Sequence, residues 1–207
     1  MVLLILYSYV GWRLILPLDI STIYRYLLGI LLVLFYCLPL LTIIFYFNKV
    51  ETQWTRIIAW LGYIGLGAIS LLFFIQLGVD IVSGLSSLIG KSHKFDPYRR
   101  AFLGLSAKGV VGGLGAIGTI WGLYNAVKTP IIKKVEISIE GLPESLQGFR
   151  MAQITDLHVG SMITGNFVEK VTRKIQKLNP NILFFTGDAA DGSVQSYGKH
   201  LNSLAEI

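Results

Sequence analysis

The chain has 207 residues, of which 53% are hydrophobic and only 14% are charged, whereas soluble domains carry about 25% charged residues. Residues 1–130 hold ten Lys/Arg and four Asp/Glu, and residues 131–207 hold eight of each, so the whole surplus of +6 lies in the apolar half. This distribution is typical of basic residues beside membrane helices, and it argues against nucleic-acid binding, which would need a basic patch on the folded domain.

Four apolar runs are predicted to span a membrane as helices, because crossing the hydrocarbon core takes about 20 apolar residues. The first is short and contains Arg13, whose long stem would let its charge reach the interface. The fourth is interrupted only by Lys108. Asp80 follows the third run, and we interpret it as an interfacial acid, although an acid inside a membrane is a functional candidate by default. The four runs cover residues 2–18, 27–47, 57–79 and 101–127.

The fourth run contains six glycines between Gly109 and Gly122. Small residues at this density are typical of closely packed membrane helices. Gly112, Gly113 and Gly115 also resemble part of a phosphate-binding loop. No predicted strand precedes them and no Lys-Ser/Thr pair follows, so we favour the packing interpretation.

Lys/Arg counts in the short loops predict the orientation of the four helices. The side of loops 17–26 and 80–100 has seven basic residues, counted with flanking positions, and the other side has five. Arg99 and Arg100 before a Gly-rich apolar run resemble a twin-arginine export signal, although that signal is normally N-terminal. They are equally well explained as cytoplasmic anchors. Both interpretations predict an integral protein of a bacterial cytoplasmic membrane, with residues 131–207 outside the cytoplasm.

Residues 131–207 are predicted to form part of an α/β domain, separate from the helical region of residues 1–130. Residues 135–139 alternate between apolar and polar, and residues 149–155 are mostly apolar, so both are predicted strands. A helix is predicted to start near Thr164 and to stop at Asn179-Pro180, and an apolar strand follows at 181–186. Two strands joined through a helix are expected to be parallel. Residues 198–207 are predicted to begin another helix.

Polar residues follow both predicted parallel strands, with Asp156 and His158 after the first and Asp188 after the second. Residues two apart on an extended chain point to the same face, and parallel strands end at the same edge of a sheet. We therefore expect these three side chains to converge, and their oxygen and nitrogen atoms suit zinc, manganese or iron. Gly187 would let the backbone approach closely. Each motif alone occurs by chance, and Asp188 could cap the next helix, but the combination favours a metal site.

The stretches Ile-Thr-Asp-Leu-His-Val-Gly (154–160) and Thr-Gly-Asp-Ala-Ala-Asp-Gly (186–192) resemble those of the calcineurin-like metallophosphoesterases, particularly a membrane-anchored bacterial branch. The resemblance runs from about residue 135 to residue 192. It implies a two-sheet α/β sandwich and two divalent or trivalent metal ions, zinc, manganese or iron. It also implies that Asp156 and His158 bind the first metal and that Asp188 bridges both. Gly187 and Asp191 are placed in the shell around these ligands, and Asp191 is similar to an acid often found in this branch.

The family's other ligand blocks, Gly-Asn-His, a further His and Gly-His-x-His, have no counterpart before Ile207. Of the other histidines, His93 is predicted in a membrane loop and His200 on a helix. We therefore expect an N-terminal fragment that holds the first half of the domain and is inactive alone, with catalytic residues downstream. The predicted function is a membrane-anchored hydrolase that cleaves a phosphomonoester or phosphodiester by metal-activated water, with a lipid-linked ester as one candidate substrate. The alternative is a non-catalytic membrane scaffold or sensor with a degenerate phosphatase-like tail.

Overall fold

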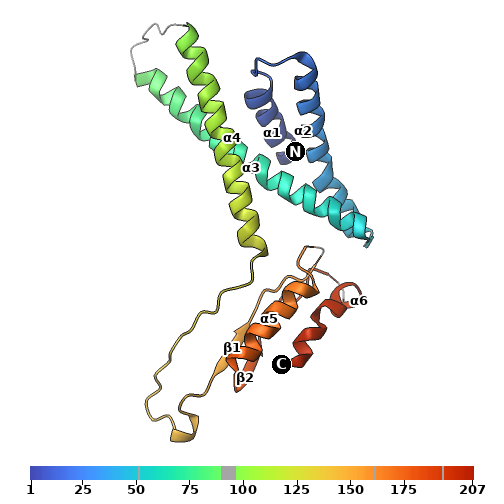
Figure 1. Ribbon diagram of the computed structural model, residues 1–207, viewed down its shortest axis with the longest axis vertical. Helices are drawn as coiled ribbons and strands as arrows, with labels where there is room; N and C mark the ends of the chain where they lie inside the picture. The colour runs from blue at the N-terminus through green and yellow to red at the C-terminus, as the bar shows by residue number, and fades with distance from the viewer. Residues whose placement is uncertain (51, 90–96, 161, 193) are drawn as a thin grey trace. The chain divides into compact units, whose positions relative to one another are not determined.

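The computed structural model describes residues 1–50, 52–89, 97–160, 162–192 and 194–207, and the chain divides into two compact units, Met1–Ala126 and Val127–Ile207 (Figure 1). The first unit contains only helices among its described residues. The second contains helices and a small parallel sheet. The division of the chain into domains at residue 130 remains a prediction.

The first unit consists of α1 (Val2–Val10), which continues as the π-helical segment η1 (Gly11–Ile15), and of three long helices, α2 (Thr22–Phe47), α3 (Gln53–Ile89) and α4 (Pro97–Val127). Among the described residues, three segments are long and apolar enough to cross a membrane: Thr22–Phe47, Gln53–Leu88 and Gly104–Val127. The first of the four predicted spans is a shorter apolar helix, Val2–Ile15, so a membrane crossing by this helix stays a prediction. The side chains of Arg99 and Arg100, and His93 as a whole, lie outside the described residues.

Glycine allows close helix packing in this unit, but mainly at positions other than those predicted. A Cβ at Gly65 of α3 would overlap the Phe35 ring of α2, and one at Gly62 would lie 3.0 Å from the Pro39 nitrogen. In α4, only Gly115 and Gly118 approach side chains of α3, and the other four glycines of the run meet nothing within 4 Å among the described residues. The packing interpretation therefore holds for one part of the Gly-rich run.

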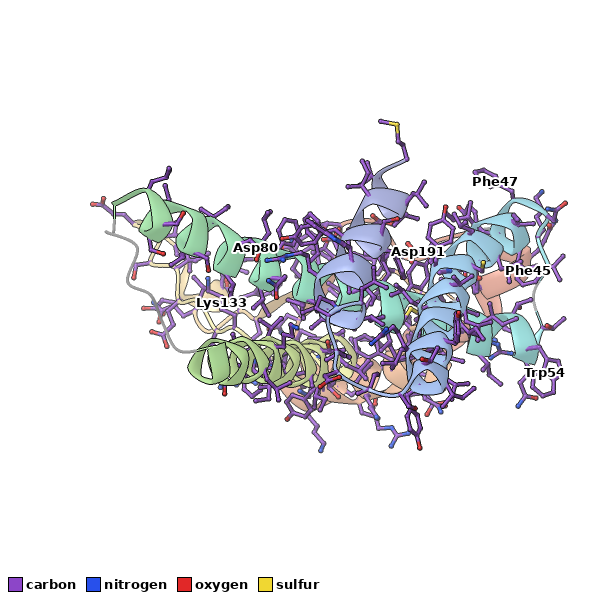
Figure 2. The ribbon with its side chains drawn as sticks, turned by 90° about the horizontal axis from the view of Figure 1, so that it is seen from above. Phe45, Phe47, Trp54, Asp80, Lys133 and Asp191 are labelled. Carbon is purple, nitrogen blue, oxygen red and sulfur yellow. The ribbon has the colours of Figure 1, made fainter. Side chains whose placement is uncertain are left out.

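Asp80, which is labelled in Figure 2, is the centre of a polar cluster that joins the first helix to α3. Arg13 forms an ion pair with Asp80 through two nitrogens, with Nε 2.6 Å from Oδ2. The Tyr9 hydroxyl donates to the same carboxylate at 2.5 Å, and Gln76 Nε2 donates to Oδ1 at 2.8 Å. Both oxygens therefore accept two hydrogen bonds. Our interpretation of Asp80 as a simple interfacial acid missed Tyr9 and Arg13, because they lie about 70 positions away in the sequence.

The second unit contains the predicted strand–helix–strand arrangement, but not the strand predicted before it. The strands β1 (Met151–Ile154) and β2 (Ile182–Phe185) are parallel, with Met151 opposite Ile182 and Ile154 opposite Phe185. Residues 135–139 form no strand, which corrects that prediction. Alternation favours a strand only where a neighbouring strand can bond to it, and among the described residues these positions pair with none. A complete two-sheet sandwich likewise remains a prediction.

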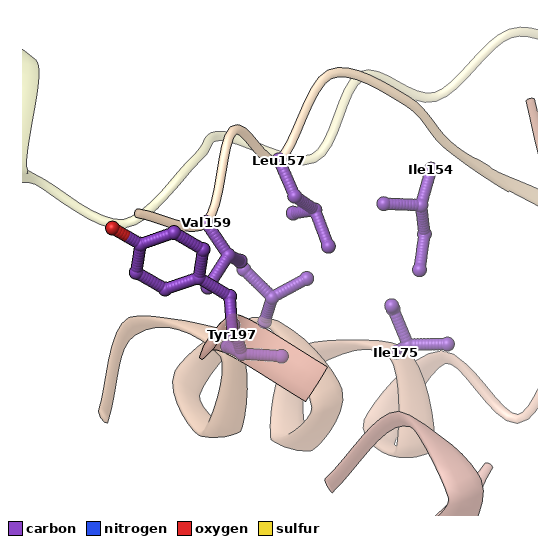
Figure 3. Close-up of a cluster of buried hydrophobic side chains, with 7 residues drawn as sticks. Ile154, Leu157, Val159, Ile175 and Tyr197 are labelled. Carbon is purple, nitrogen blue, oxygen red and sulfur yellow. The ribbon is translucent and has the colours of Figure 1, made fainter. Parts of the chain in front are cut away.

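Helix α5 (Gly165–Leu178) connects the two strands and begins and ends where the sequence predicts. Its N-cap is Thr164, and Asn179 ends it in the left-handed conformation (φ 45°), followed by a proline, which cannot continue a helix. The buried face of α5 packs under the strand ends, and Tyr197 of the short helix α6 (Val194–Tyr197) completes the cluster (Figure 3). The core comprises Ile154, Leu157, Val159, Val168, Val171, Ile175 and Tyr197.

The predicted C-terminal helix is the 3-10 helix η3 (Gly198–Glu206), which packs on α5 through Leu201 and Leu204. The Thr172 hydroxyl lies 3.4 Å from that of Ser203, and Gln176 Nε2 donates to the Glu206 carbonyl at 3.1 Å. A second 3-10 turn, η2 (Glu144–Leu146), precedes β1. The core therefore holds α5 and η3 against the same face of the strand segments, the face to which Leu157 and Val159 contribute.

The Asp80 cluster predicts a measurable loss of stability on Asp80→Asn. The substitution preserves shape but leaves the Arg13 charge without its partner, and because the side chains are 36% and 21% exposed the cost should fall below that of a fully buried pair, at about 1–3 kcal/mol. Thermal unfolding in neutral detergent measures this. The exchanged pair Arg13→Asp with Asp80→Arg should recover part of the loss, whereas Arg56→Gln should change little. Equal melting temperatures for all variants would contradict the cluster's stabilising role.

Candidate metal site at the strand ends

The regular strands end where the polar residues begin, but backbone hydrogen bonds between the two segments continue through the polar residues. Beyond β1 and β2, the Asp156 amide donates to the Gly187 carbonyl at 3.2 Å, and the His158 amide donates to the Asp188 carbonyl at 3.2 Å. A parallel bridge between Val159 and Ala190 follows. The polar residues therefore lie in a kinked section held at both ends by strand-like pairing.

The backbone of this section is not extended, which corrects the geometry assumed from the sequence. Asp156, His158 and Asp188 have φ values of 55°, 47° and 51°, in the left-handed region that L-residues rarely adopt. Such conformations cluster at functional sites because the surrounding structure must hold them. Gly187 (φ 114°) lies in the same section, and a Cβ there would meet nothing within 4 Å. Its glycine is thus explained by the conformation it adopts, not by a close approach of the backbone.

Burial of neighbouring apolar residues directs the polar side chains outward. Leu157 and Val159 are buried in the core against α5 (Figure 3). Asp156 and His158, in contrast, are exposed. The sequence analysis missed that Leu157 and Val159 anchor this section in the core, although the alternation of polar and apolar residues in Asp156-Leu-His-Val159 is a signal for it. Asp156 and His158 thus point to the same side, as predicted, but because their apolar neighbours are buried and not because the chain is extended.

The three predicted ligands converge on one point. One ligand atom from each of Asp156, His158 and Asp188 lies within 4.8 Å of the other two. His158 Nε2 is 3.3 Å from Asp188 Oδ2, and two ligands at about 2.1 Å from one ion can be at most about 4.2 Å apart. The donor set of two carboxylates and an imidazole suits a divalent metal ion, and the spacing of His158 Nε2 and Asp188 Oδ2 is short enough for both atoms to bind one ion.

Asp191 holds the other nitrogen of the imidazole. His158 Nδ1 is 2.6 Å from Asp191 Oδ1, and since an ionised carboxylate can only accept, Nδ1 donates the proton. This arrangement leaves Nε2 on the side of Asp188. Gly160 lies beside Asp191, since a Cβ there would be in van der Waals contact with Cβ and Oδ2 of Asp191, each 3.4 Å away. The residue placed in the surrounding shell from the sequence thus contacts the predicted ligand directly.

The acidic surroundings raise the pKa of the His158 imidazole above 6.5, chiefly through the hydrogen bond to Asp191 and then through the charge of Asp188. In the metal-free chain these neighbours therefore stabilise the protonated form of the imidazole. A metal ion must displace that proton from Nε2, so acidity competes with metal binding.

The pKa shift predicts a titration that NMR can follow in the metal-free chain. The ring protons of His158, assigned by their loss in His158→Gln, should titrate above pH 6.5, and Asp191→Asn should move the midpoint down towards 6.5 because the main cause is removed. Glu169→Gln is the matched control, since Glu169 is an exposed acid on α5 that pairs with Arg173. A midpoint at or below 6.5 before substitution would contradict the contact with Asp191.

Comparison with known proteins shows similarity to metallophosphoesterases from several organisms. A zebrafish "Transmembrane protein with metallophosphoesterase domain" is 27% identical over 78% of this chain and 35% of its own length. A Campylobacter jejuni metallophosphoesterase is 28% identical over 66% of this chain and 35% of its own. The UDP-2,3-diacylglucosamine pyrophosphatase LpxG of Chlamydia trachomatis is 51% identical over 43 residues, which are 21% of this chain and 13% of LpxG.

The similarity to the zebrafish protein covers too much of the chain to be confined to the second unit. The chain spans about a third of the length of these first two relatives. No protein-family model and no solved structure matches it. The relatives confirm the resemblance inferred from the two motifs.

Proposed function

We propose that this chain, which belongs to the calcineurin-like metallophosphoesterase family, is the N-terminal part of a membrane-anchored hydrolase that cleaves a phosphate ester with the help of divalent metal ions. The observation that carries the proposal is the convergence of Asp156, His158 and Asp188 at the ends of two parallel strands. The apolar helices support the anchor. The bacterial cytoplasmic membrane, with the second unit outside the cytoplasm, is the location that we propose.

The residues divide the work as follows. Asp156, His158 and Asp188 would hold metal, with Asp188 between two ions, and Asp191 would fix the imidazole so that Nε2 faces the metal. When bound, such ions act as Lewis acids on a phosphoryl oxygen and lower the pKa of water towards about 7. Gly187 provides the backbone conformation that precedes Asp188. The kinked backbone, paired on both sides, holds these side chains in place before any ligand arrives.

The substrate class that we propose is a phosphate ester carried on a lipid. Two relatives are UDP-2,3-diacylglucosamine pyrophosphatases, whose substrate carries acyl chains by its name. The membrane unit supports this choice, since an enzyme fixed at a bilayer meets lipid-linked esters more often than soluble ones. Hydrolysis would then take place at the bilayer surface.

Metal binding can be tested on the chain itself, without activity. Calorimetric titration with Mn²⁺ should show binding near neutral pH. Asp191→Asn should weaken it about 10–100-fold, as for other carboxylates that orient a metal-binding histidine, and Asp188→Asn should weaken it further because a ligand is lost. Glu169→Gln should bind as the parent does. Equal affinity of the Asp188→Asn variant and the parent would remove Asp188 from the metal site.

Activity is tested in the protein encoded by the whole reading frame that contains these 207 residues. Asp188→Asn should abolish metal-dependent hydrolysis of a chromogenic phosphodiester, while Glu169→Gln retains it. Retained activity in the Asp188→Asn variant would contradict the bridging role. A stop codon directly after Ile207 would favour the non-catalytic scaffold over the enzyme.

A further inference from the structure

Three basic residues of the first unit lie at one short segment, Gly11–Leu18: one belongs to it and two contact it. Arg13 lies within it, Lys108 Nζ of α4 is 3.1 Å from the Pro17 carbonyl oxygen, and Arg25 of α2 places one terminal nitrogen 2.8 Å from the Leu18 carbonyl oxygen. Pro17 and Leu18 are adjacent, so the charged groups of Arg25 and Lys108 are brought to neighbouring carbonyls. Elements far apart in the sequence thus concentrate positive charge at one end of the unit.

The three cations differ in how their charge is balanced. Arg13 has the Asp80 carboxylate, whereas the acceptors of Arg25 and Lys108 among the described residues are uncharged carbonyls. Asp19 is the acid nearest to Arg25 in the sequence, and it is exposed and forms no ion pair with any described residue. Arg25 and Lys108 therefore lack a countercharge from the described chain.

Arg25 also lacks acceptors. Its Nε is buried and has no hydrogen-bond partner among the described residues, and its guanidinium carries five N–H donors in all. Donors left without partners next to a bilayer are costly, because lipid tails offer no acceptor. An oxygen-rich anion would supply both the missing acceptors and the missing charge.

The place of the two residues indicates where such an anion would come from. Arg25 lies three residues inside the apolar segment Thr22–Phe47, and Lys108 four residues inside Gly104–Val127. Both are thus near the ends of membrane-crossing segments, at the depth of lipid headgroups. Phospholipids with a net negative charge concentrate there, and basic pockets between membrane helices recognise such headgroups.

We propose that Arg25 and Lys108, held on the Pro17 and Leu18 carbonyls, form a binding site for the phosphate of an anionic phospholipid headgroup. The site is separate from the metal-binding cluster and does not depend on the proposed hydrolase activity. Asp19 opposes it, because a negative charge beside Leu18 repels the headgroup. Occupation of the site would tie the first helix, α2 and α4 to one lipid.

The test uses the whole chain in neutral detergent, titrated with phosphatidylglycerol, with phosphatidylcholine and with inorganic phosphate, and read by native mass spectrometry. We expect preferential binding of phosphatidylglycerol. Arg25→Gln and Lys108→Gln should each weaken it about fivefold, the usual contribution of one basic residue at an anionic surface. Asp19→Asn should strengthen it.

Lys49→Gln and Arg56→Gln are matched controls, because each removes one positive charge. Lys49 follows the C-terminal end of α2, and Arg56 lies in the first turn of α3, so both are at the other end of α2 from Arg25. They should leave binding unchanged. Equal weakening by the controls would show diffuse attraction and overturn the site, as would equal binding of phosphatidylcholine. Equal binding of inorganic phosphate would assign the site to a free anion and overturn the lipid proposal. Lys108→Arg, which keeps the charge, should bind as the parent does, and this excludes misfolding as the cause of the losses.

Discussion

The second unit depends on the parallel pairing of two chain segments that loses its regular strand geometry once and then regains it. The regular pairing runs from Met151 and Ile182 to the strand ends, is replaced by two irregular backbone hydrogen bonds in the polar section, and returns at Val159 and Ala190. A break between two paired regions cannot relax, since both of its ends are fixed by hydrogen bonds and by burial against α5. Three non-glycine residues can therefore be held in left-handed conformations, each of which costs about 1–2 kcal/mol.

Much of this arrangement follows from the sequence. The helical spacing of apolar residues and the stop at Asn179-Pro180 located α5, and two strands joined through a helix implied parallel neighbours and hence ligands on one edge. The local backbone could not be predicted, because a left-handed conformation at an Asp or His has no distinctive residue pattern. Residues 135–139 show a second limit of the sequence. Their alternation is what a strand with one buried face would have, but it does not tell whether a partner strand is present.

In the first unit the sequence located the helices by hydropathy but not their polar contacts. Hydropathy depends on the average over about 20 residues, so a single acid such as Asp80 is recognised only as the end of an apolar run. Its partners, Tyr9 and Arg13, lie on a helix that is itself too short to qualify as a span. The cluster explains how that helix can carry an arginine, because the charge is neutralised by a neighbour at the same depth.

The two clusters of charged residues in this chain differ in how fully their hydrogen-bonding capacity is used, and this difference separates a structural role from a binding role. Each oxygen of Asp80 accepts two hydrogen bonds from within the unit, so the cluster has no vacancy for a ligand and acts to join helices. At the strand ends, three carboxylates surround one imidazole, and about half of the surface of His158, Asp188 and Asp191 is exposed. Mutual repulsion of these carboxylates is relieved most directly by a multivalent cation. The same reasoning places Arg25 and Lys108 with the binding residues, since their charge has no opposite within the described chain.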